Sequence, residues 1–161
     1  MENIQIKAIV VTVSDSRRED DDISGVTLSE KLLSIGAEVL EKIIVSDDFE
    51  NLRQTLYDLT ERDDINLIIT TGGTGFSERD NTPEATGAVI EKEAPGLAEA
   101  MRAETLKNTP FAMLSRGVCG IRNQTLIINL PGSTKGVQEC FDVIKPVLQH
   151  AVNLLKGNTK H

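Results

Sequence analysis

Residues 66–86, NLIITTGGTGFSERDNTPEAT, decide the expected fold and the place of the site within it. The segment opens with the apolar run NLIITT, which has the length and β-branched composition of a buried strand. Gly72, Gly73 and Gly75 follow directly, and a helix is expected to begin at the proline, since Pro83 near a first helical position needs no N–H partner. A strand, a glycine-rich loop and a helix in this order are typical of a parallel α/β sheet.

The sequence before this segment repeats the alternation of strand and helix. Strands are expected at 6–13 and 37–45, a long exposed loop at 14–25, and amphipathic helices at 28–35 and from near 48 to 62. This βαβαβ order predicts a doubly wound, largely parallel sheet whose functional groups gather beyond the carboxyl ends of its strands.

After the glycine loop the pattern is less regular. Helices are expected at 82–93 and 95–106, strands at 111–116 and 125–130, a PGS turn at 131–133, and a last helix kinked at Pro146. No internal repeat or domain linker interrupts the chain. One domain over 1–161 is expected, with a frayed tail at about 157–161.

Composition narrows the function classes. The 161 residues carry a formal net charge of −8, no Trp and one Tyr, and there is no basic run, which argues against nucleic acid and acidic membrane surfaces as partners. The first residues, MENIQIKAIVVTVSD, have no cluster of positive charge and only a short apolar run, so they predict a strand rather than a signal peptide or a membrane span. A cytoplasmic location is expected.

Several conspicuous residues need no chemical role. Cys119 and Cys140 have no metal or disulfide spacing and are expected to be small core residues. The acidic run 19–22 lacks the ligand spacing of a calcium loop and is expected to be a solvated charge run. Around His150 and His161 the sequence shows no Ser, Cys or second His at a spacing that indicates a triad or a metal site.

The loop Gly72, Gly73, Thr74 and Gly75 can bring backbone N–H groups close to an anion. It is not a Walker A loop, because no Gly-Lys-Ser/Thr follows, and it lacks the third glycine of the dinucleotide fingerprint. A tight turn without a ligand is the alternative explanation.

Charged residues beside the loop favour a site. Arg79 can meet a phosphate, and the adjacent Asp80 can hold a divalent cation or cap the next helix. Asp47 follows the second strand and should reach the same edge of the sheet, and the alternative is that Asp47 or Ser46 caps the following helix. Both alternatives stay open at this point.

Further polar groups follow the remaining strands. They are Ser14 and Asp15 at the end of the first strand, Ser115 and Arg116 at the end of the expected strand at 111–116, and Gly132, Ser133 and Lys135 at the start of the last helix. Because parallel strands end at one edge, these groups are expected on one rim. Their convergence favours a binding cleft over an accidental arrangement.

An ordered set of motifs resembles the MoaB/Mog family of molybdenum cofactor biosynthesis proteins. They are TTGGTG at 70–75, RDNTPEAT at 79–86, PG at 95–96, FAMLSR at 111–116, GIR at 120–122 and LPGS at 130–133, with TVSD at 12–15 and EDDDISG at 19–25 leaning toward the MoaB branch. The resemblance covers almost the whole chain. It implies a three-layer α/β/α sandwich that assembles as a homotrimer or homohexamer.

The resemblance also implies an activity, which is transfer of AMP from Mg·ATP to the terminal phosphate of molybdopterin with release of pyrophosphate. The product would pass to a separate molybdate-inserting enzyme. The family carboxylates correspond to Asp47 and Asp80, which would bind Mg²⁺, while 72–75 would bind ligand phosphates or pterin. Ser115 and Arg116 would contact the molybdopterin phosphate, with Ser133 in support.

One departure from the pattern concerns residues 133–135, Ser-Thr-Lys, where Mog-type enzymes often carry Asn or Gln followed by Pro. The rival hypotheses are a non-catalytic member that binds molybdopterin or a pathway partner, an NAD-dependent oxidoreductase and a structural scaffold. The oxidoreductase lacks its GxGxxG fingerprint here. The retained carboxylate pair favours the enzyme over the non-catalytic member.

Overall fold

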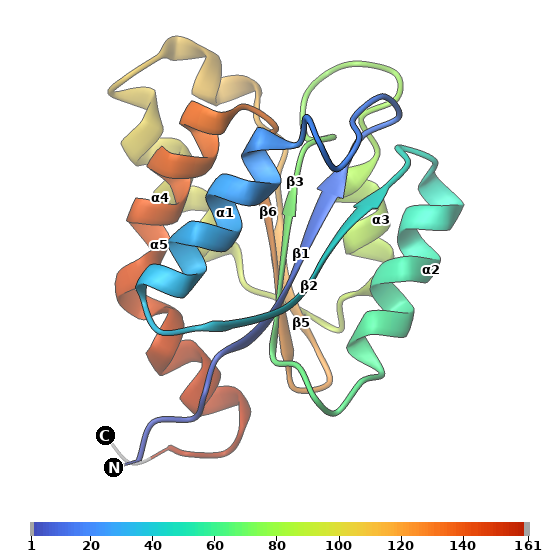
Figure 1. The fold of residues 1–161 in the computed structure, drawn as a ribbon. Coiled ribbons are helices and arrows are strands. Elements are labelled where there is room, and N and C mark those ends of the chain that lie inside the picture. Colours follow the sequence, from blue (N-terminus) through green and yellow to red (C-terminus); the bar gives the residue numbers. More distant parts are fainter. Residues whose placement is uncertain (1, 160–161) are drawn as a thin grey trace.

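The computed structural model describes residues 2–159 and forms a six-stranded sheet in the order β2-β1-β3-β6-β5-β4 (Figure 1). The strands are β1 (Lys7–Val13), β2 (Glu38–Val45), β3 (Leu67–Thr71), β4 (Lys92–Glu93), β5 (Cys119–Arg122) and β6 (Thr125–Leu130). The β2-β1-β3-β6 part is parallel, whereas β5 and β4 extend it in antiparallel pairing. The predicted mostly parallel sheet is confirmed.

Helices cover both faces of this sheet. They are α1 (Ile23–Ser34), α2 (Phe49–Thr60), α3 (Thr82–Val89), α4 (Pro95–Leu106) and α5 (Thr134–Leu155), with a 3₁₀ helix η1 at Pro110–Leu114. Figure 1 shows α1, α4 and α5 on one face and α2 and α3 on the other; α5 contacts both α1 and α4, and α2 contacts α3. The result is the expected three-layer α/β/α sandwich.

The apolar runs of the central strands are explained by burial on both faces. In β1, Ala8 and Val10 point into the core beneath α1, α4 and α5, while Ile9 and Val11 point into the core beneath α2 and α3. The same alternation continues in β3 and β6. A strand buried on both sides cannot show the polar alternation of a half-exposed strand.

The predicted strand at 111–116 is wrong, because Pro110–Leu114 forms η1. Pro110 starts the turn, the Thr109 hydroxyl accepts the Phe111 N–H at 3.3 Å, and Phe111 is 74% exposed. Proline cannot donate to a strand ladder, and apolar side chains in a sheet would be buried. The apolar composition of the segment therefore gave a misleading signal.

The predicted helix over 82–93 is too long. It ends at Val89, and Lys92–Glu93 pairs with the unpredicted strand β5. β5 spans only Cys119–Arg122, too short for a periodic pattern to be visible in the sequence. The predicted exposed loop at 14–25 is also wrong at its end, since α1 begins at Ile23.

Two isolated predictions had different outcomes. Cys119 and Cys140 are both buried, as expected, and burial raises the pKa of Cys119 to about 12. The acidic run at 19–22 is exposed as predicted except for Asp22, which is 1% exposed. Of the predicted frayed tail, 160–161 lies outside the described residues, as does the position of His161.

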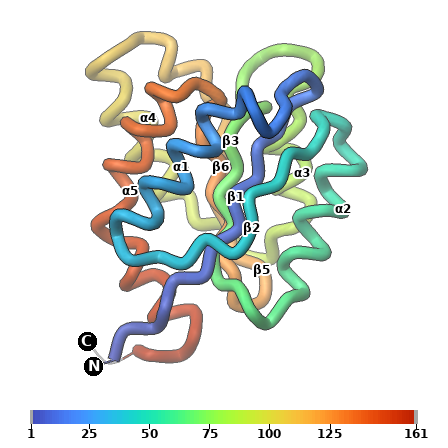
Figure 2. The backbone as a smooth tube through the Cα atoms, in the orientation of Figure 1, coloured from blue at the N-terminus to red at the C-terminus, as the bar shows by residue number. Residues whose placement is uncertain are grey.

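The loops that follow the parallel strands meet at one end of the sheet. Figure 2 shows the segments after β1, β2 and β3 grouped at the top, while the chain near its two ends runs at the bottom. From β1 the chain first adds β2 on one side of the sheet and then β3 on the other, so the strand order changes direction at β1. In parallel α/β sheets, ligand-binding crevices form at such switch points. Within residues 2–159 no helix is long and apolar enough to cross a membrane.

The fully buried Phe141 of α5 gives a test of the core beneath α1, α4 and α5. We expect Phe141→Ala to lower the free energy of unfolding by about 3–5 kcal/mol, because it removes a large apolar side chain and leaves a cavity. Urea unfolding followed by circular dichroism measures the change. The control Phe76→Ala, at a side chain 70% exposed, should shift stability by less than about 0.5 kcal/mol.

Candidate active site at the carboxyl ends of the parallel strands

The glycine loop after β3 is held in a conformation that only glycine adopts easily. Gly72 has φ +101° and Gly73 has φ +68°. A Cβ on Gly72 would lie 2.5 Å from the carbonyl oxygen of Val13 at the end of β1. Thr82, the first residue of α3, closes the loop by donating its hydroxyl to the Gly72 carbonyl at 2.9 Å and its N–H to the Gly73 carbonyl at 3.0 Å. The loop is therefore held tightly against β1 and α3, with Gly73 and Gly75 partly exposed.

Asp47 and Asp80 approach this loop from two sides. The Asp47 Oδ1 lies 3.2 Å from the position of a Cβ built on Gly73, and the Asp80 Oδ2 lies 2.9 Å from one built on Gly75. Asp80 also accepts the Ser77 N–H at 2.9 Å. The two carboxylates predicted from separate parts of the sequence thus flank the same few backbone atoms.

Neither carboxylate caps a helix. The N-cap of α2 is Asp48, which accepts the Asn51 N–H, and the N-cap of α3 is Asn81, which makes no side-chain cap hydrogen bond. The capping alternatives for Asp47, Ser46 and Asp80 are therefore wrong. The carboxylates of Asp47 and Asp80 are therefore not used for helix capping.

Asp15 joins the carboxylate pair from the end of β1. Its N–H donates to Asp47 Oδ2 at 3.0 Å, and the Asp47 N–H donates back to Asp15 Oδ1 at 3.0 Å. Arg79 donates Nε and Nη2 to Asp15 at 2.9 and 3.0 Å. The Ser14 hydroxyl accepts the Arg17 N–H at 3.1 Å and closes the turn. The loops after β1, β2 and β3 thus bring together the sequence-predicted residues Asp15, Asp47 and Arg79, with Ser14 beside Asp15.

The electrostatics of the two neighbouring carboxyl groups differ. The pKa of Asp47 is raised, first by desolvation and then by repulsion from Asp15 and Asp80. The pKa of Asp15 is lowered, mainly by the hydrogen bond from the Asp47 backbone and by Arg79. Negative charge at Asp47 is thus poorly compensated by the protein itself, which favours a cation at this position.

The donor set fits a cation that takes few protein ligands. Among residues 2–159 no group of three or more His, Cys, Asp or Glu side chains is placed to hold a metal ion. Mg²⁺ is commonly bound by one or two carboxylates together with water and substrate phosphates. Asp47 and Asp80 suit this mode and do not suit a closed zinc or calcium cage.

Arg116 secures the far side of the loop. Its Nε donates to the Gly75 carbonyl at 2.7 Å, its Nη2 to the Asp80 carbonyl at 2.7 Å, and its Nη1 to Glu84 at 2.8 Å. Its backbone N–H donates to the Thr74 carbonyl at 2.8 Å. Every nitrogen of this side chain is therefore engaged in fixing the segment that carries Asp80.

Ser115 and Ser133 face a different part of the rim. They line a cavity of about 250 Å³ between α4, η1 and α5, with Met101, Gly117, Asn129 and Cys140 in its wall. Asp47 and Asp80 do not line this cavity. The carboxylate cluster and the mostly apolar cavity are separate regions, connected by the glycine loop and the turn after β6.

The turn after β6 lies against the glycine loop. A Cβ on Gly132 would lie 3.3 Å from the Gly72 Cα. Ser133 is the N-cap of α5 and accepts the Gly136 N–H at 3.0 Å. Lys135 is 78% exposed and lies 3.8 Å from Glu139, so it faces solvent rather than the loop.

Some polar residues at the rim gave no clear sequence signal. Asn129 lies inside the apolar run of β6 and donates to the hydroxyls of Thr70 and Thr86, both at 3.0 Å. Arg102 on α4 donates to the carbonyls of Ser115 and Gly117. A single Asn in a strand or Arg in a helix is ordinary, so only the fold shows that these side chains support the cavity wall.

The sandwich is the fold of a known family. The model of a probable molybdopterin binding domain matches residues 9–150, and the chain belongs to this family. The family predicted from the motifs is therefore confirmed.

Individual relatives extend this result. The chain is 39% identical to a molybdopterin adenylyltransferase of Helicobacter pylori over 160 residues, which is 98% of the chain and 91% of that protein. It is 44% identical over 150 residues to the molybdenum cofactor synthesis protein cinnamon of Drosophila melanogaster, covering 91% of the chain but only 25% of that protein. A solved structure of the molybdopterin biosynthesis enzyme MoaB from Thermus thermophilus aligns with TM-score 0.87 and 41% identity, covering 95% of this chain and 98% of that one.

The raised pKa of Asp47 predicts a stability change. A carboxyl group whose folded-state pKa is raised contributes stability below its unfolded pKa, and loses that contribution as the pH rises through the folded-state pKa. Asp47→Asn removes the charge and keeps an acceptor for the Asp15 N–H. We therefore expect the variant to melt at a higher temperature than the wild type at pH 7, with a difference that shrinks as the pH falls toward about 4.

Thermal unfolding at a series of pH values without divalent cations measures this difference. Asp58→Asn, in an exposed position on α2, is the control for a general loss of negative charge. A destabilised Asp47→Asn at pH 7 would contradict the interpretation that the charge at Asp47 is uncompensated.

Proposed function

We propose that this chain is a molybdopterin adenylyltransferase of molybdenum cofactor biosynthesis. It would join the terminal phosphate of molybdopterin to the α-phosphate of ATP, with cleavage of the bond between the α- and β-phosphates and release of pyrophosphate. The observation that carries the proposal is the pair Asp47 and Asp80 flanking the glycine loop. The names of the full-length bacterial relatives support it.

Mg²⁺ accompanying ATP would be held by Asp47 and Asp80, where it would neutralise charge on the phosphates. The uncompensated charge at Asp47 and the absence of a helix-capping duty for either side chain support this assignment. Their role is binding and orientation rather than proton abstraction. A phosphate monoester with a second pKa of about 6 is already largely ionised near neutral pH and needs no general base.

The chain's own groups would align the two phosphates. Gly73 and Gly75 are partly exposed, and the backbone of 73–75 would offer N–H groups to phosphate or pterin. The Gly72 N–H is already donated to the Leu130 carbonyl at 3.1 Å, so Gly72 would shape the loop rather than bind the ligand. Ser115 and Ser133, on the cavity wall, would contact the molybdopterin side of the complex. Such a reaction depends mainly on positioning and charge stabilisation, so groups held rigidly before substrate arrives are effective.

Two arginines would act differently from each other. Arg79 is 58% exposed and can move between Asp15 and a ligand phosphate. Arg116 is held by the Gly75 and Asp80 carbonyls and by Glu84, so a direct phosphate contact would require it to give up one of these bonds. We assign Arg116 the positioning of the Asp80 segment, with the phosphate contact left mainly to Ser115.

The remaining expectations stay predictions. A homotrimer or homohexamer, transfer of the product to a molybdate-inserting enzyme, and a cytoplasmic location follow from the family resemblance and from composition. Light scattering of the purified protein measures the first of these directly.

The proposed activity predicts molybdopterin-dependent release of pyrophosphate from Mg·ATP. We expect Asp47→Asn and Asp80→Asn to lower kcat by at least about 100-fold, because each removes a charged cation ligand and keeps the shape of the side chain. Asp48→Asn, next to Asp47 but at the N-cap of α2, is the matched control and should keep near wild-type turnover.

Absence of pyrophosphate release by a wild-type protein that binds molybdopterin would contradict the proposal. That result would identify the chain as a non-catalytic molybdopterin-binding member of the family.

A second prediction does not depend on turnover. Mg²⁺ together with a non-hydrolysable ATP analogue should raise the melting temperature of the wild type, since a ligand that binds only the folded state stabilises it. The shift should be much smaller for Asp47→Asn and Asp80→Asn and unchanged for Asp48→Asn. Equal shifts in all four proteins would place the cation elsewhere.

A further inference from the structure

Asp22 is a buried carboxylate outside the carboxylate cluster at the glycine loop. Its side chain is 0% exposed and accepts the Thr12 hydroxyl at 2.6 Å, the Lys42 ammonium at 3.1 Å and the Gly25 N–H at 3.0 Å. These partners lower the pKa of Asp22 against the opposing effect of burial. A buried charge with this many partners fixes the loop after β1 and the start of α1 to the sheet.

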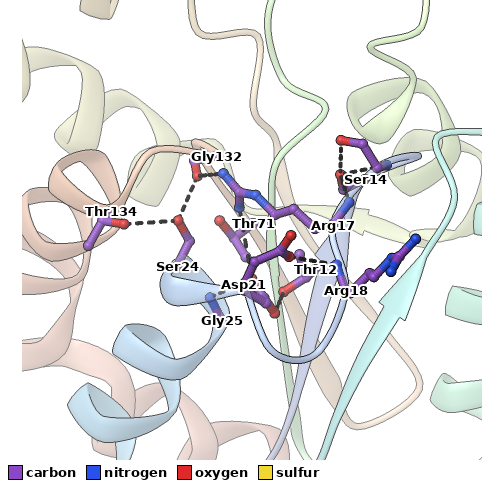
Figure 3. Close-up of polar contacts among 12 residues, drawn as sticks. Thr12, Ser14, Arg17, Arg18, Asp21, Ser24, Gly25, Thr71, Gly132 and Thr134 are labelled. Atoms are coloured by element: carbon purple, nitrogen blue, oxygen red, sulfur yellow. Dashed lines mark hydrogen bonds and ion pairs between the residues drawn. The ribbon is translucent and has the colours of Figure 1, made fainter.

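Arg17 lies close to Asp22 and reaches the turn after β6. Its Nη1 is 3.9 Å from Asp22 Oδ1, and its Nη2 donates to the Gly132 carbonyl at 3.0 Å. The hydroxyl of Ser24 donates to the same carbonyl at 2.7 Å and lies 3.3 Å from the Thr134 hydroxyl. Figure 3 shows Arg17 and Ser24 approaching Gly132 together from the loop and from α1.

The two donors determine which way the Gly132–Ser133 peptide faces. The described chain contains no cis peptide bond, so the carbonyl and the N–H of this peptide point in opposite directions. Because the carbonyl is held toward Arg17 and Ser24, the Ser133 N–H is directed away from them. Ser133 itself lines the cavity between α4, η1 and α5.

Other contacts restrict the rest of the turn after β6. Gly132 lies against Gly72, since a Cβ on Gly132 would be 3.3 Å from the Gly72 Cα. The Pro131 carbonyl is held by the Thr71 hydroxyl at 2.7 Å. Rotation of the Gly132–Ser133 peptide is therefore the main freedom that Arg17 and Ser24 remove.

We propose that Arg17 and Ser24, organised by buried Asp22, are positioning residues for the molybdopterin side of the site. They hold the peptide after Gly132 with its N–H turned to the cavity, so that the turn after β6 is preformed when the anionic substrate binds. This inference rests on the proposed function in one respect, the identity of the ligand. The contacts that fix the turn are independent of it.

This role differs from the stabilising role of Asp22. Thr12, Lys42 and Gly25 all bind Asp22 directly, so its loss disturbs the fold. Arg17 is 34% exposed, and its hydrogen bond to Gly132 joins two rim segments without filling a core position. Removing the Arg17 guanidinium should thus change the turn while leaving the fold in place.

The test uses Arg17→Met, which keeps an unbranched apolar side chain and removes the N–H donors. Arg18→Met is the matched control, because it removes the same group at an adjacent, exposed position. We expect amide hydrogen exchange across 131–137 to be about tenfold faster in Arg17→Met, since a charge-assisted hydrogen bond is lost. Arg18→Met should exchange as the wild type does.

Equilibrium binding of molybdopterin is measured on the same proteins. We expect the dissociation constant to rise about tenfold in Arg17→Met and in Ser24→Ala, with the double variant showing less than the product of the two effects because both residues serve one carbonyl. In an active protein the KM for molybdopterin should rise likewise while kcat changes less than about twofold. Asp22→Asn should show the same exchange effect together with a lower melting temperature.

The outcomes separate the two proposals. Unchanged exchange across 131–137 in Arg17→Met, or faster exchange without weaker molybdopterin binding, would overturn the positioning role. Absence of pyrophosphate release by the wild type would overturn the adenylyltransferase proposal alone, because exchange and binding would still report on Arg17 and Ser24.

Discussion

The site depends on the close approach of the glycine loop to the end of β1. A Cβ on Gly72 would lie 2.5 Å from the Val13 carbonyl, and the turn at Gly132 lies against the same residue from the other side. No side chain fits between these segments, so the backbone itself forms the floor of the site. Because Gly73 and Gly75 carry no side chain, the carboxylates of Asp47 and Asp80 can approach the loop closely, at 3.2 and 2.9 Å from where a Cβ would stand.

The charged side chains at the rim must favour anionic substrates although the net charge of the protein is negative. The chain carries a formal net charge of −8, yet the proposed substrates are anionic. Arg79 offsets Asp15, whereas Asp47 is left next to Asp15 and Asp80 with its pKa raised. A divalent cation at this point would turn a repulsive cluster into a binding feature, which links the electrostatics of the site to the identity of its co-substrate.

Polar side chains with several hydrogen-bond partners hold the rim in place. Arg116 joins the glycine loop to the start of α3, and Asp22 joins the loop after β1 to the sheet. Arg17, next to Asp22, connects the loop after β1 to the Gly132 carbonyl. Each of these side chains makes hydrogen bonds to backbone carbonyls or N–H groups, so the loops are fixed without additional apolar packing. A preorganised rim suits a reaction in which alignment of two phosphates is the main requirement.

The sequence by itself determined the parallel part of the sheet, its covering helices and the carboxylate pair, because apolar periodicity and motif order are local properties. It failed for η1, β4 and β5, whose short lengths and tertiary pairings leave no periodic signal. It placed Asp47 and Asp80 at one edge but left capping open, and only the structure assigned the caps to Asp48 and Asn81.

The partners of Asp22, Arg17 and Arg116 were likewise decided only by tertiary structure. An acidic residue in a polar run predicts solvent exposure, whereas Asp22 is buried against Lys42, 20 residues away. Arg17 reaches Gly132 across 115 residues of sequence. Hydrogen bonds between segments this far apart depend on the folded geometry of the rim, and no spacing in the sequence encodes them.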